Sequence, residues 1–446
     1  MTAQTLSLLS DLLRHARQAG ADAAEAVHVS SLSVGAGVRN GVTEELERSE
    51  TTDMGLRVFI GCKSAIVSTS TVEPARFAQL AAQAMAMARV LPDDRYAGLA
   101  SQAMTTPCTD NALHLNDPAE PDTATLLERA RLGEDAALAI TGVTNSAGAS
   151  ASCGRTQVSF ATTGGFSGQY ARSSHANSVC VLAGSGESMQ RDYDHHATLW
   201  LHDLTDAAEL GRNAGQKAVA RLNPTRPRTG RTPVVFHPRV AGSFLNHFAG
   251  AINGTAIARG TSFLKDRMDQ ALFSSEISIT DDPTRIKGLR SRPFDGEGLR
   301  MAPLSLVRDG VLSSWLLDSR SARQLGLETN ARAGRGTSGP PSPGATNLFF
   351  EPGTLSPTEL MADIKEGLYI TEMMGSSING LTGDYSRGAS GFMIRDGQIA
   401  EPVAEFTLAG NLLEIFASMT LANDLAFRFG TDAPTLRVET LNTAGA

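Results

Sequence analysis

The stretch Pro233–Gly254 reads PVVFHPRVAGSFLNHFAGAING, and it predicts a short apolar strand that leads directly into a helix. The apolar residues of the helix recur about once per turn, at Val240, Phe244, Phe248 and Ala251. A strand that leads into a helix is a rigid frame of the kind that carries functional side chains. Asn246 and His247 are the polar residues in this apolar run. They are therefore candidates for chemistry.

The composition is that of a soluble globular protein with more than one domain. A chain of 446 residues is too long for a single ordinary core, and 41% hydrophobic with 19% charged residues is a globular balance. A net charge of −8 argues against a nucleic-acid partner, because phosphate binding needs clustered Lys and Arg. No uncharged apolar run approaches the roughly 20 residues that span a bilayer, so no membrane partner is expected.

The four cysteines, Cys62, Cys108, Cys153 and Cys180, form no C-x-x-C pair and are too few for a disulfide scaffold of this size. We therefore expect a reducing, cytoplasmic setting.

The first 222 residues predict two regions. Residues 1–100 read as an α+β domain with a helix, two hairpins and a second helix, and the Asn40-Gly41 pair is a strong hairpin signal. Residues 101–222 read as a connector, a helix over about 123–140, an antiparallel meander over 144–200 and a helix over about 204–222. The segment 223–232, NPTRPRTGRT, predicts a linker.

Residues 233–446 predict a C-terminal domain of hairpins and short strands with few helices. Within it, the composition of 331–345, ARAGRGTSGPPSPGA, is typical of a mobile loop. The fold class expected for the whole chain is α+β. An N-terminal α/β hairpin-and-helix domain is followed by a larger mixed, mainly antiparallel β domain.

A cluster of imidazoles and carboxylates between 192 and 203 is the densest metal-like group: Asp192, Asp194, His195, His196, His202 and Asp203. On a strand, the adjacent His195 and His196 point to opposite faces and are poorly placed to share one ion. A polar turn beside a solvated strand fits this cluster better than a metal site. The metal site stays an alternative.

The glycine-rich segment 375–391 has no Gly-Lys-Ser/Thr and no G-x-G-x-x-G pattern, so its glycines suit tight turns rather than phosphate binding. A serine nucleophile at Ser386 or Ser390 would need a general base, and no histidine follows His247. A zinc peptidase helix needs two histidines and a glutamate. From the residues alone, a half-buried His247 with a local hydrogen bond is the favoured interpretation.

Many segments, in the right order from end to end, resemble the TldD/PmbA family, and specifically its PmbA (TldE) branch. These proteins are related to metalloproteases and were once described as modulators of DNA gyrase. The segments that carry the resemblance include TSFLKD (261–266), DDP (281–283), RPFDGEG (292–298), LLDSRSAR (316–323), TGDYSRGASG (382–391) and TLAGN (407–411).

The resemblance implies that this chain lacks the catalytic zinc. The TldD branch carries H-E-x-x-x-H on the helix after the PVV-like strand, and a cysteine further on. In this sequence the helix positions fall on Asn246, His247 and Ala251, and no cysteine follows Asn411. Each of the missing groups is needed on chemical grounds. No cofactor is therefore expected in this chain, and zinc is expected in a TldD-type partner.

The family further implies a heterodimeric or larger TldD–TldE assembly that processes small unfolded or modified peptides. We expect a substrate strand to add to the glycine-rich edge between Gly375 and Tyr385. The candidate substrate- or partner-binding residues are Gly375, Ser376, Asn379, Thr382, Asp384, Ser386 and Asn411. A two-fold homodimer is a further expectation when the partner is absent.

Two other classes of function stay open. One is an independent hydrolase that uses His247 or the 192–203 cluster. The other is a regulatory binding protein that acts on gyrase or a toxin system.

Overall fold

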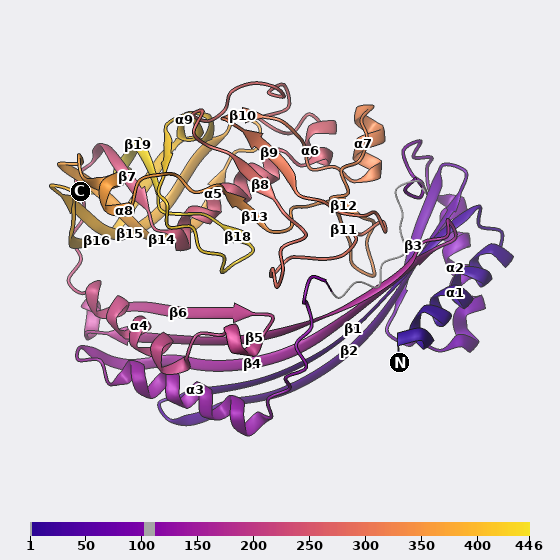
Figure 1. The fold of residues 1–446 in the computed structure, drawn as a ribbon, viewed down its shortest axis with the longest axis horizontal. Helices are drawn as coiled ribbons and strands as arrows, with labels where there is room; N and C mark the ends of the chain where they lie inside the picture. Colours follow the sequence, from indigo (N-terminus) through magenta and orange to yellow (C-terminus); the bar gives the residue numbers. More distant parts are fainter. Residues whose placement is uncertain (1, 102–111) are drawn as a thin grey trace.

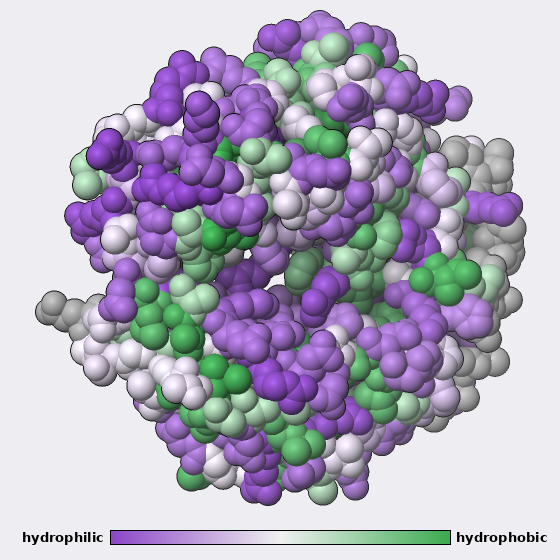
Figure 2. All heavy atoms as spheres, turned by 60° about the vertical axis from the view of Figure 1, so that its left-hand side comes forward, coloured by the Kyte–Doolittle hydropathy of each residue, from purple (hydrophilic) through white to green (hydrophobic). Residues whose placement is uncertain are grey.

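The computed structural model describes residues 2–101 and 112–446, and it has two layers (Figure 1). One layer is a long, curved six-stranded sheet with helices on its outer side. The other is the C-terminal region, which lies across the opposite face of that sheet (Figure 1). Figure 2 shows an opening between the two layers, with hydrophilic residues along its lower rim. Cys108 lies outside the described residues.

The sheet is antiparallel throughout, with the order β3-β2-β1-β4-β5-β6. Its strands are β1 (Ala23–Arg39), β2 (Val42–Ile60), β3 (Lys63–Thr69), β4 (Val143–Thr162), β5 (Ser167–Ala183) and β6 (Gln190–Thr198). Its helices are α1 (Thr2–Gln18), α2 (Phe77–Val90), α3 (Thr123–Leu138) and α4 (Ala207–Ala220). In the described part of the chain they are accompanied by the short 3₁₀ turns η1 (Pro74–Arg76), η3 (Gly186–Ser188) and η4 (Leu201–Asp203).

Small residues let these helices pack closely. A Cβ added at Gly211 of α4 would lie 2.0 Å from the carbonyl oxygen of Gly133 of α3, so the two helix backbones are in direct contact. The face of the sheet beneath them is also made of small side chains, including Ala36, Ala149 and Val181. This packing explains how a chain with few aromatic residues still forms a close-packed core between the helices and the sheet.

The predicted meander and its flanking helices are present, and the predicted α+β class is confirmed. Asn40 and Gly41 form the turn between β1 and β2, with positive φ at both residues. Strands β1–β3 and β4–β6 belong to one sheet although they come from the regions 1–100 and 101–222. The domain boundaries themselves stay a prediction.

The C-terminal region contains a small closed barrel. Strand β14 pairs with β7 in parallel and with β15 antiparallel, and β19 pairs with both β7 and β16. The strands of this region are β7 (Gly230–Phe236), β8 (Ile279–Asp281), β9 (Leu304–Arg308), β10 (Val311–Leu312), β11 (Ala333–Gly334), β12 (Ser342–Pro343), β13 (Leu348–Phe350), β14 (Glu366–Ile378), β15 (Asp384–Arg395), β16 (Gln398–Asn411), β17 (Met419–Leu421), β18 (Thr431–Asp432) and β19 (Leu436–Ala444). The helices are α5 (Pro238–Ala251), α6 (Gly254–Ala258), α7 (Ser319–Leu325), α8 (Pro357–Met361) and α9 (Leu412–Ala417).

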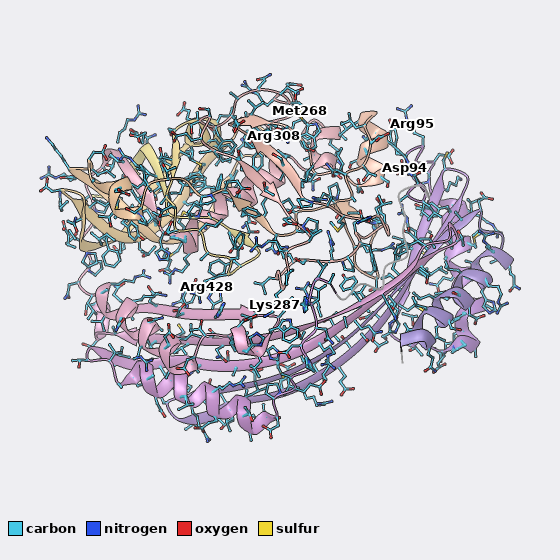
Figure 3. All side chains as sticks on the ribbon, viewed as in Figure 1. Asp94, Arg95, Met268, Lys287, Arg308 and Arg428 are labelled. Atoms are coloured by element: carbon cyan, nitrogen blue, oxygen red, sulfur yellow. The ribbon has the colours of Figure 1, made fainter. Side chains whose placement is uncertain are left out.

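The two layers are joined by charged contacts. Figure 3 shows Lys287 and Arg428 where the layers face each other. The ammonium group of Lys287 lies 2.9 Å from Oδ2 of Asp203, and a guanidinium nitrogen of Arg428 donates to the carbonyl oxygen of His195 at 3.1 Å.

The segment 331–345, expected to be a mobile loop, is partly structured. Strands β11 and β12 pair within it, and the guanidinium of Arg332 is buried and donates to Asp281 at 2.5 Å. A Cβ at Gly55 of β2 would lie 2.0 Å from the carbonyl oxygen of Thr337, so the segment packs directly on the sheet. This close approach is possible because Gly55 of β2 has no side chain. The mobility of the segment stays a prediction.

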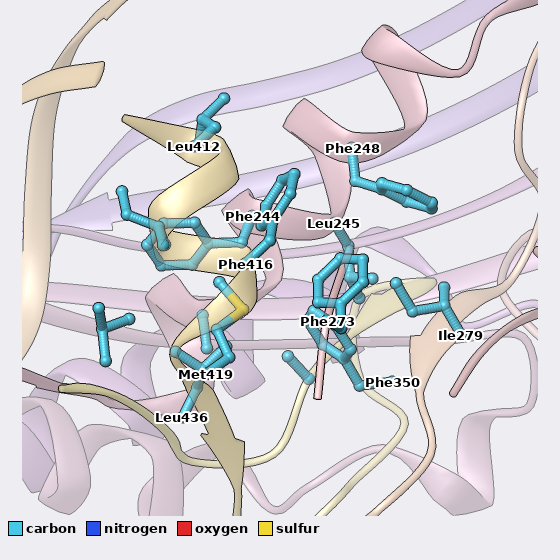
Figure 4. Packing of buried hydrophobic residues seen from close by; sticks show 14 of the residues in the cluster. Phe244, Leu245, Phe248, Phe273, Ile279, Phe350, Leu412, Phe416, Met419 and Leu436 are labelled. Carbon is cyan, nitrogen blue, oxygen red and sulfur yellow. The ribbon is translucent and has the colours of Figure 1, made fainter. Parts of the chain in front are cut away.

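The core of the C-terminal region is built around α5 (Figure 4). Phe248 lies edge to face with Phe273 and with Phe416, at centroid distances of 5.7 and 6.1 Å. Phe244, Phe248 and Ala251 are buried, so the predicted apolar face of the helix is present. Among the described residues, no helix is both long and apolar enough to cross a membrane.

Candidate functional site

The start of α5 is fixed by His237 and Pro238. The backbone N–H of His237 donates to the carbonyl oxygen of Ile370 in β14 at 2.9 Å, which continues the β7–β14 pairing. Its Nδ1 accepts a hydrogen bond from the backbone N–H of Arg239 at 3.0 Å and so caps the helix. Burial, with Arg239 and Lys217 nearby, lowers the pKa of His237 to about 4, so this ring is neutral and accepts.

The three positions of interest on α5 have different surroundings. Asn246 is exposed, His247 is half-buried and Ala251 is 7% exposed. The His247 ring faces Tyr385 of β15 at a centroid distance of 6.2 Å. Burial and the nearby Arg387 lower the pKa of His247 to about 4. Its Nε2 is buried without a hydrogen-bond partner among the described residues, so this atom does not make the expected local bond.

The side chains at these positions do not fit a zinc ion. A protein zinc site takes three or four nitrogen, sulfur or oxygen ligands. Asn246, His247 and Ala251 together offer one imidazole, one neutral amide and one methyl group. Over residues 2–101 and 112–446, no group of three His, Cys, Asp or Glu side chains is arranged to hold a metal ion.

The β14–β15 hairpin ends in a turn that joins four of the predicted binding residues. Oδ1 of Asn379 accepts from the backbone N–H of Leu381 at 2.9 Å, and the hydroxyl of Thr382 donates to Asp384 at 2.6 Å. The amide of Asn411 donates to the carbonyl oxygen of Thr382 at 2.9 Å and to Asp384 at 3.3 Å. These hydrogen bonds hold the pKa of Asp384 below its usual value. The turn is therefore a single hydrogen-bonded unit.

The other predicted binding residues lie along the hairpin strands. Gly375 is exposed and has a φ of +70°, and the strand register shifts between Met374 and Ser377. Ser386 pairs with Ser377 across the hairpin. The side chain of Ser376 lies outside the described part of the structure. Glycine is needed at 375 because other residues rarely adopt this φ.

Tyr385 connects the hairpin to α5. Its ring stacks on Phe244 with a centroid distance of 5.7 Å and an interplanar angle of 27°. Its hydroxyl donates to the sulfur of Met373 at 3.2 Å, and burial raises its pKa. The strand edge expected to receive a peptide is thereby attached to α5.

The 192–203 cluster is not gathered at one point. Asp192 lies between Arg239 at 2.7 Å and Arg221 at 3.2 Å. His195 packs between Tyr193 and Phe429, and His196 accepts from the backbone N–H of Thr205 at 3.1 Å. His202 and Asp203 contact Lys287. Asp194 pairs with Lys217 at 3.2 Å. The carboxylates and imidazoles of the cluster therefore have partners at several separate places rather than around one point.

The ion pairs around Asp192 join the two layers, and sequence reasoning missed them. Arg221 at the end of α4 contacts Asp192, Glu372 of β14 and the hydroxyl of Ser390 at 2.7 Å. Arg239 at the start of α5 donates to the carbonyl oxygen of Thr371 at 2.8 Å. Arg221 and Glu372 are far apart in sequence, so no spacing could have signalled this cluster.

Family models of one group of metallopeptidases match three consecutive parts of the chain. They are described as PmbA/TldA metallopeptidase domain 1 over residues 24–88, central domain over 116–222 and C-terminal domain over 229–445. The chain therefore belongs to the PmbA/TldD family of metallopeptidases. The resemblance inferred from the sequence is confirmed.

One curated relative is the metalloprotease PmbA of Escherichia coli O157:H7, which is 31% identical over 95% of this chain and 92% of its own length. Two crystal structures share the fold. A protein described as a candidate modulator of DNA gyrase from Bacteroides thetaiotaomicron has a TM-score of 0.90 at 23% identity, over 99% of this chain and 98% of its own. TldE from Thermococcus kodakarensis has a TM-score of 0.87 at 19% identity, over 98% of this chain and 100% of its own.

Proposed function

We propose that this chain is a PmbA/TldE-like, non-catalytic subunit of a TldD–TldE-type zinc metalloprotease complex. The complex processes or degrades small unfolded or modified peptides. The TldD-type partner supplies the zinc and the general base. The observation that supports the proposal is the set of side chains on helix α5: Asn246, His247 and Ala251, onto which the family resemblance maps the zinc motif, offer a single imidazole.

The role of this chain is to bind the peptide. Strand β14 pairs with β15 along one side, whereas on the other side its pairing with β7 covers Leu368 to Ile370. Beyond Ile370, the segment from Glu372 to Ile378 has no strand on this side among the described residues. An edge without a neighbouring strand can pair with an extended peptide. One group of this segment, the carbonyl oxygen of Met373, already accepts from a guanidinium nitrogen of Arg387 at 3.4 Å.

A peptide with altered backbone chemistry tests this strand addition. Methylation of alternate backbone nitrogens removes the donors of one strand edge and leaves the side chains in place. We expect the methylated peptide to bind at least about tenfold more weakly than its unmethylated form. Equal affinities of the two peptides would refute binding by strand addition.

Complex formation is tested by purifying the chain alone and together with a TldD-type subunit. The mixture should give a heterodimer or a larger complex by native mass measurement, with zinc and peptide cleavage found in the complex. The isolated chain should self-associate into a two-fold dimer without zinc.

Two other functions have less support. An independent hydrolase would use His247 or the 192–203 cluster. Within residues 2–101 and 112–446, neither belongs to a group of three side chains that could hold a metal ion, and Asp192 of the cluster is held between Arg221 and Arg239. A regulatory protein of the gyrase-modulator type is supported only by the description of a protein with the same fold. Binding of gyrase in the absence of any TldD-type subunit would favour the regulatory function.

A further inference from the structure

A cavity of about 260 Å³ lies between the end of β6 and the loops of the C-terminal region. Its sheet side includes residues 196–199 and Asp203, and the facing wall includes residues 285–289, Asn347 and Asp432. Helix α5 contributes no residue to this wall. The cavity is therefore separate from the α5 and hairpin site.

The wall of the cavity belongs to a cationic loop. Residues 283–292, PTRIKGLRSR, contain four cations and no carboxylate, in a chain whose net charge is −8. Figure 3 shows Lys287 in the space between the two layers, with Arg428 also facing it. Of the four cations of the loop, Arg285 and Lys287 line the cavity itself.

The loop is held in a fixed shape by Asn347, which is 2% exposed. Its Oδ1 accepts from the backbone N–H of Arg290 at 2.9 Å, and its Nδ2 donates to the carbonyl oxygen of Asp282 at 2.7 Å and to the Ser291 hydroxyl at 2.8 Å. A Cβ at Gly288 would lie 2.9 Å from that same Nδ2. The cavity wall is thus formed before any ligand binds.

Both carboxylates that line the cavity already have partners. Asp203 pairs with Lys287 at 2.9 Å. Asp432 accepts hydrogen bonds from the backbone N–H groups of residues 428–430 at 2.8–3.1 Å. Neither of them forms a salt bridge with Arg285.

The guanidinium of Arg285 is half-buried, and among the described residues it makes no hydrogen bond or ion pair. Its central carbon lies 3.2 Å from the ring centroid of Phe427 and 5.7 Å from that of Phe349, and these two rings contact each other edge to face. Stacking uses the face of the guanidinium and leaves its in-plane N–H groups for an acceptor. The acceptor that matches this planar fork best is a carboxylate.

We propose that Arg285 anchors a carboxylate-binding subsite in this cavity, and that the subsite takes the C-terminal carboxylate of a peptide held between the two layers. The choice of a peptide as ligand rests on the proposed function. An Asp or Glu side chain carries the same group, so the test separates these two sources.

The test measures the affinity of the full-length chain for three fluorescent peptides by anisotropy. The first has a free C-terminal carboxylate and no acidic side chain, the second is its C-terminal amide, and the third is the amide with one internal Glu. We expect the free carboxylate to bind about tenfold or more tightly than the amide, because a charged hydrogen-bonded pair is lost in the amide. Tight binding of the third peptide alone would assign the subsite to an acidic side chain and overturn the C-terminal assignment.

Substitutions test whether the preference for a free carboxylate depends on Arg285. Arg285→Ala should remove the preference for the free carboxylate, and Arg285→Lys should restore only part of it, because an ammonium lacks the planar fork. Arg308→Ala is the matched control, since Arg308 is exposed on β9 and lines no part of this cavity. An unchanged preference in Arg285→Ala, or equal binding of acid and amide by the unmodified chain, would overturn the proposal.

Failure of this subsite can be told apart from failure of the proposed function. If the chain and a TldD-type subunit form no active complex, the proposed function fails. If the two chains do form an active complex, but the Arg285→Ala variant binds the three peptides with the same affinities as the unmodified chain, only the subsite proposal fails.

Discussion

His247 of α5 and Tyr385 of β15 meet edge to face, with ring centroids 6.2 Å apart and ring planes at 70°. The contact joins α5, where we propose that the zinc motif of the family is degenerate, to the strand hairpin that we expect to bind peptide. At its centre is a neutral imidazole whose Nε2 has no partner among the described residues.

Replacement of His247 by Phe tests whether this imidazole has a chemical role. Phe keeps a ring against Tyr385 and removes the unpaired buried nitrogen, so we expect the free energy of unfolding to stay within about 1 kcal/mol or to rise. Peptide cleavage by the complex should be unchanged. Tyr385→Ala is the control for packing and should cost about 3–5 kcal/mol. A tenfold loss of cleavage in His247→Phe, with stability intact, would show that the imidazole takes part in catalysis.

Asp192→Asn should weaken the joint between the two layers. Asp192 is 3% exposed and holds Arg221 and Arg239, so its loss leaves two buried cations with less compensation. We expect a destabilisation of about 3 kcal/mol in urea unfolding. Glu405→Gln removes the exposed pair with Arg226 and should change stability by less than about 1 kcal/mol. If the two substitutions lower the free energy of unfolding equally, the ion pairs of Asp192 do not stabilise the contact between the two layers.

Glu297→Gln should make stability less dependent on pH. Burial, together with Asp295 and Asp318, raises the pKa of Glu297 from 4.5 to about 8. A carboxyl with a raised pKa in the folded state contributes stability below pH 4.5, and this contribution is lost as the pH rises through about 8. The Gln oxygen still accepts from the Ser319 N–H and hydroxyl, which lie 2.9 and 2.7 Å from Oε2 of Glu297.

The melting temperature of Glu297→Gln should therefore exceed that of the unmodified chain at pH 8.5 and approach it at pH 5. Glu328→Gln, at an exposed position, should show no such difference. If the melting temperatures of Glu297→Gln and the unmodified chain differ by the same amount at both pH values, the pKa of Glu297 is not raised by folding.

Asn411→Ala should loosen the turn that ends the hairpin. The side chain of Asn411 caps α9 through the Leu413 N–H at 3.0 Å and also binds Thr382 and Asp384. Loss of the cap and these bonds should cost about 1–2 kcal/mol and weaken peptide binding. Asn246→Ala is the matched control, because this exposed residue of α5 should tolerate Ala without loss. If the two substitutions have equal effects, the turn is not a structural unit.

The sequence predicted local structure well where hydrophobic spacing determines it. The apolar face of α5 and the Asn40-Gly41 turn follow from periodicity and from backbone preference. The contacts of Asp192 could not be predicted in this way, because its partners come from α4 and from the C-terminal region. Proximity in sequence suggested a metal cluster instead. The composition of segment 331–345 also gave no sign of its packing on β2, which depends on the missing side chain of Gly55 rather than on the glycines of the segment.

The Arg285 cavity did leave a signal in the sequence that was not used. Four cations without a carboxylate in residues 283–292 are unusual in an acidic chain. The sequence could not show that Arg285 stacks on Phe427, because the two residues are more than a hundred positions apart. It also could not show that the N–H groups of Arg285 have no hydrogen-bond partner among the described residues.

The most direct test of the central claim is the zinc content and peptide cleavage of the purified chain, alone and with a TldD-type subunit. We expect no stoichiometric zinc and no cleavage in the isolated chain, and about one zinc per heterodimer with cleavage in the complex. Stoichiometric zinc with full cleavage in the isolated chain would contradict the claim that this is the non-catalytic subunit.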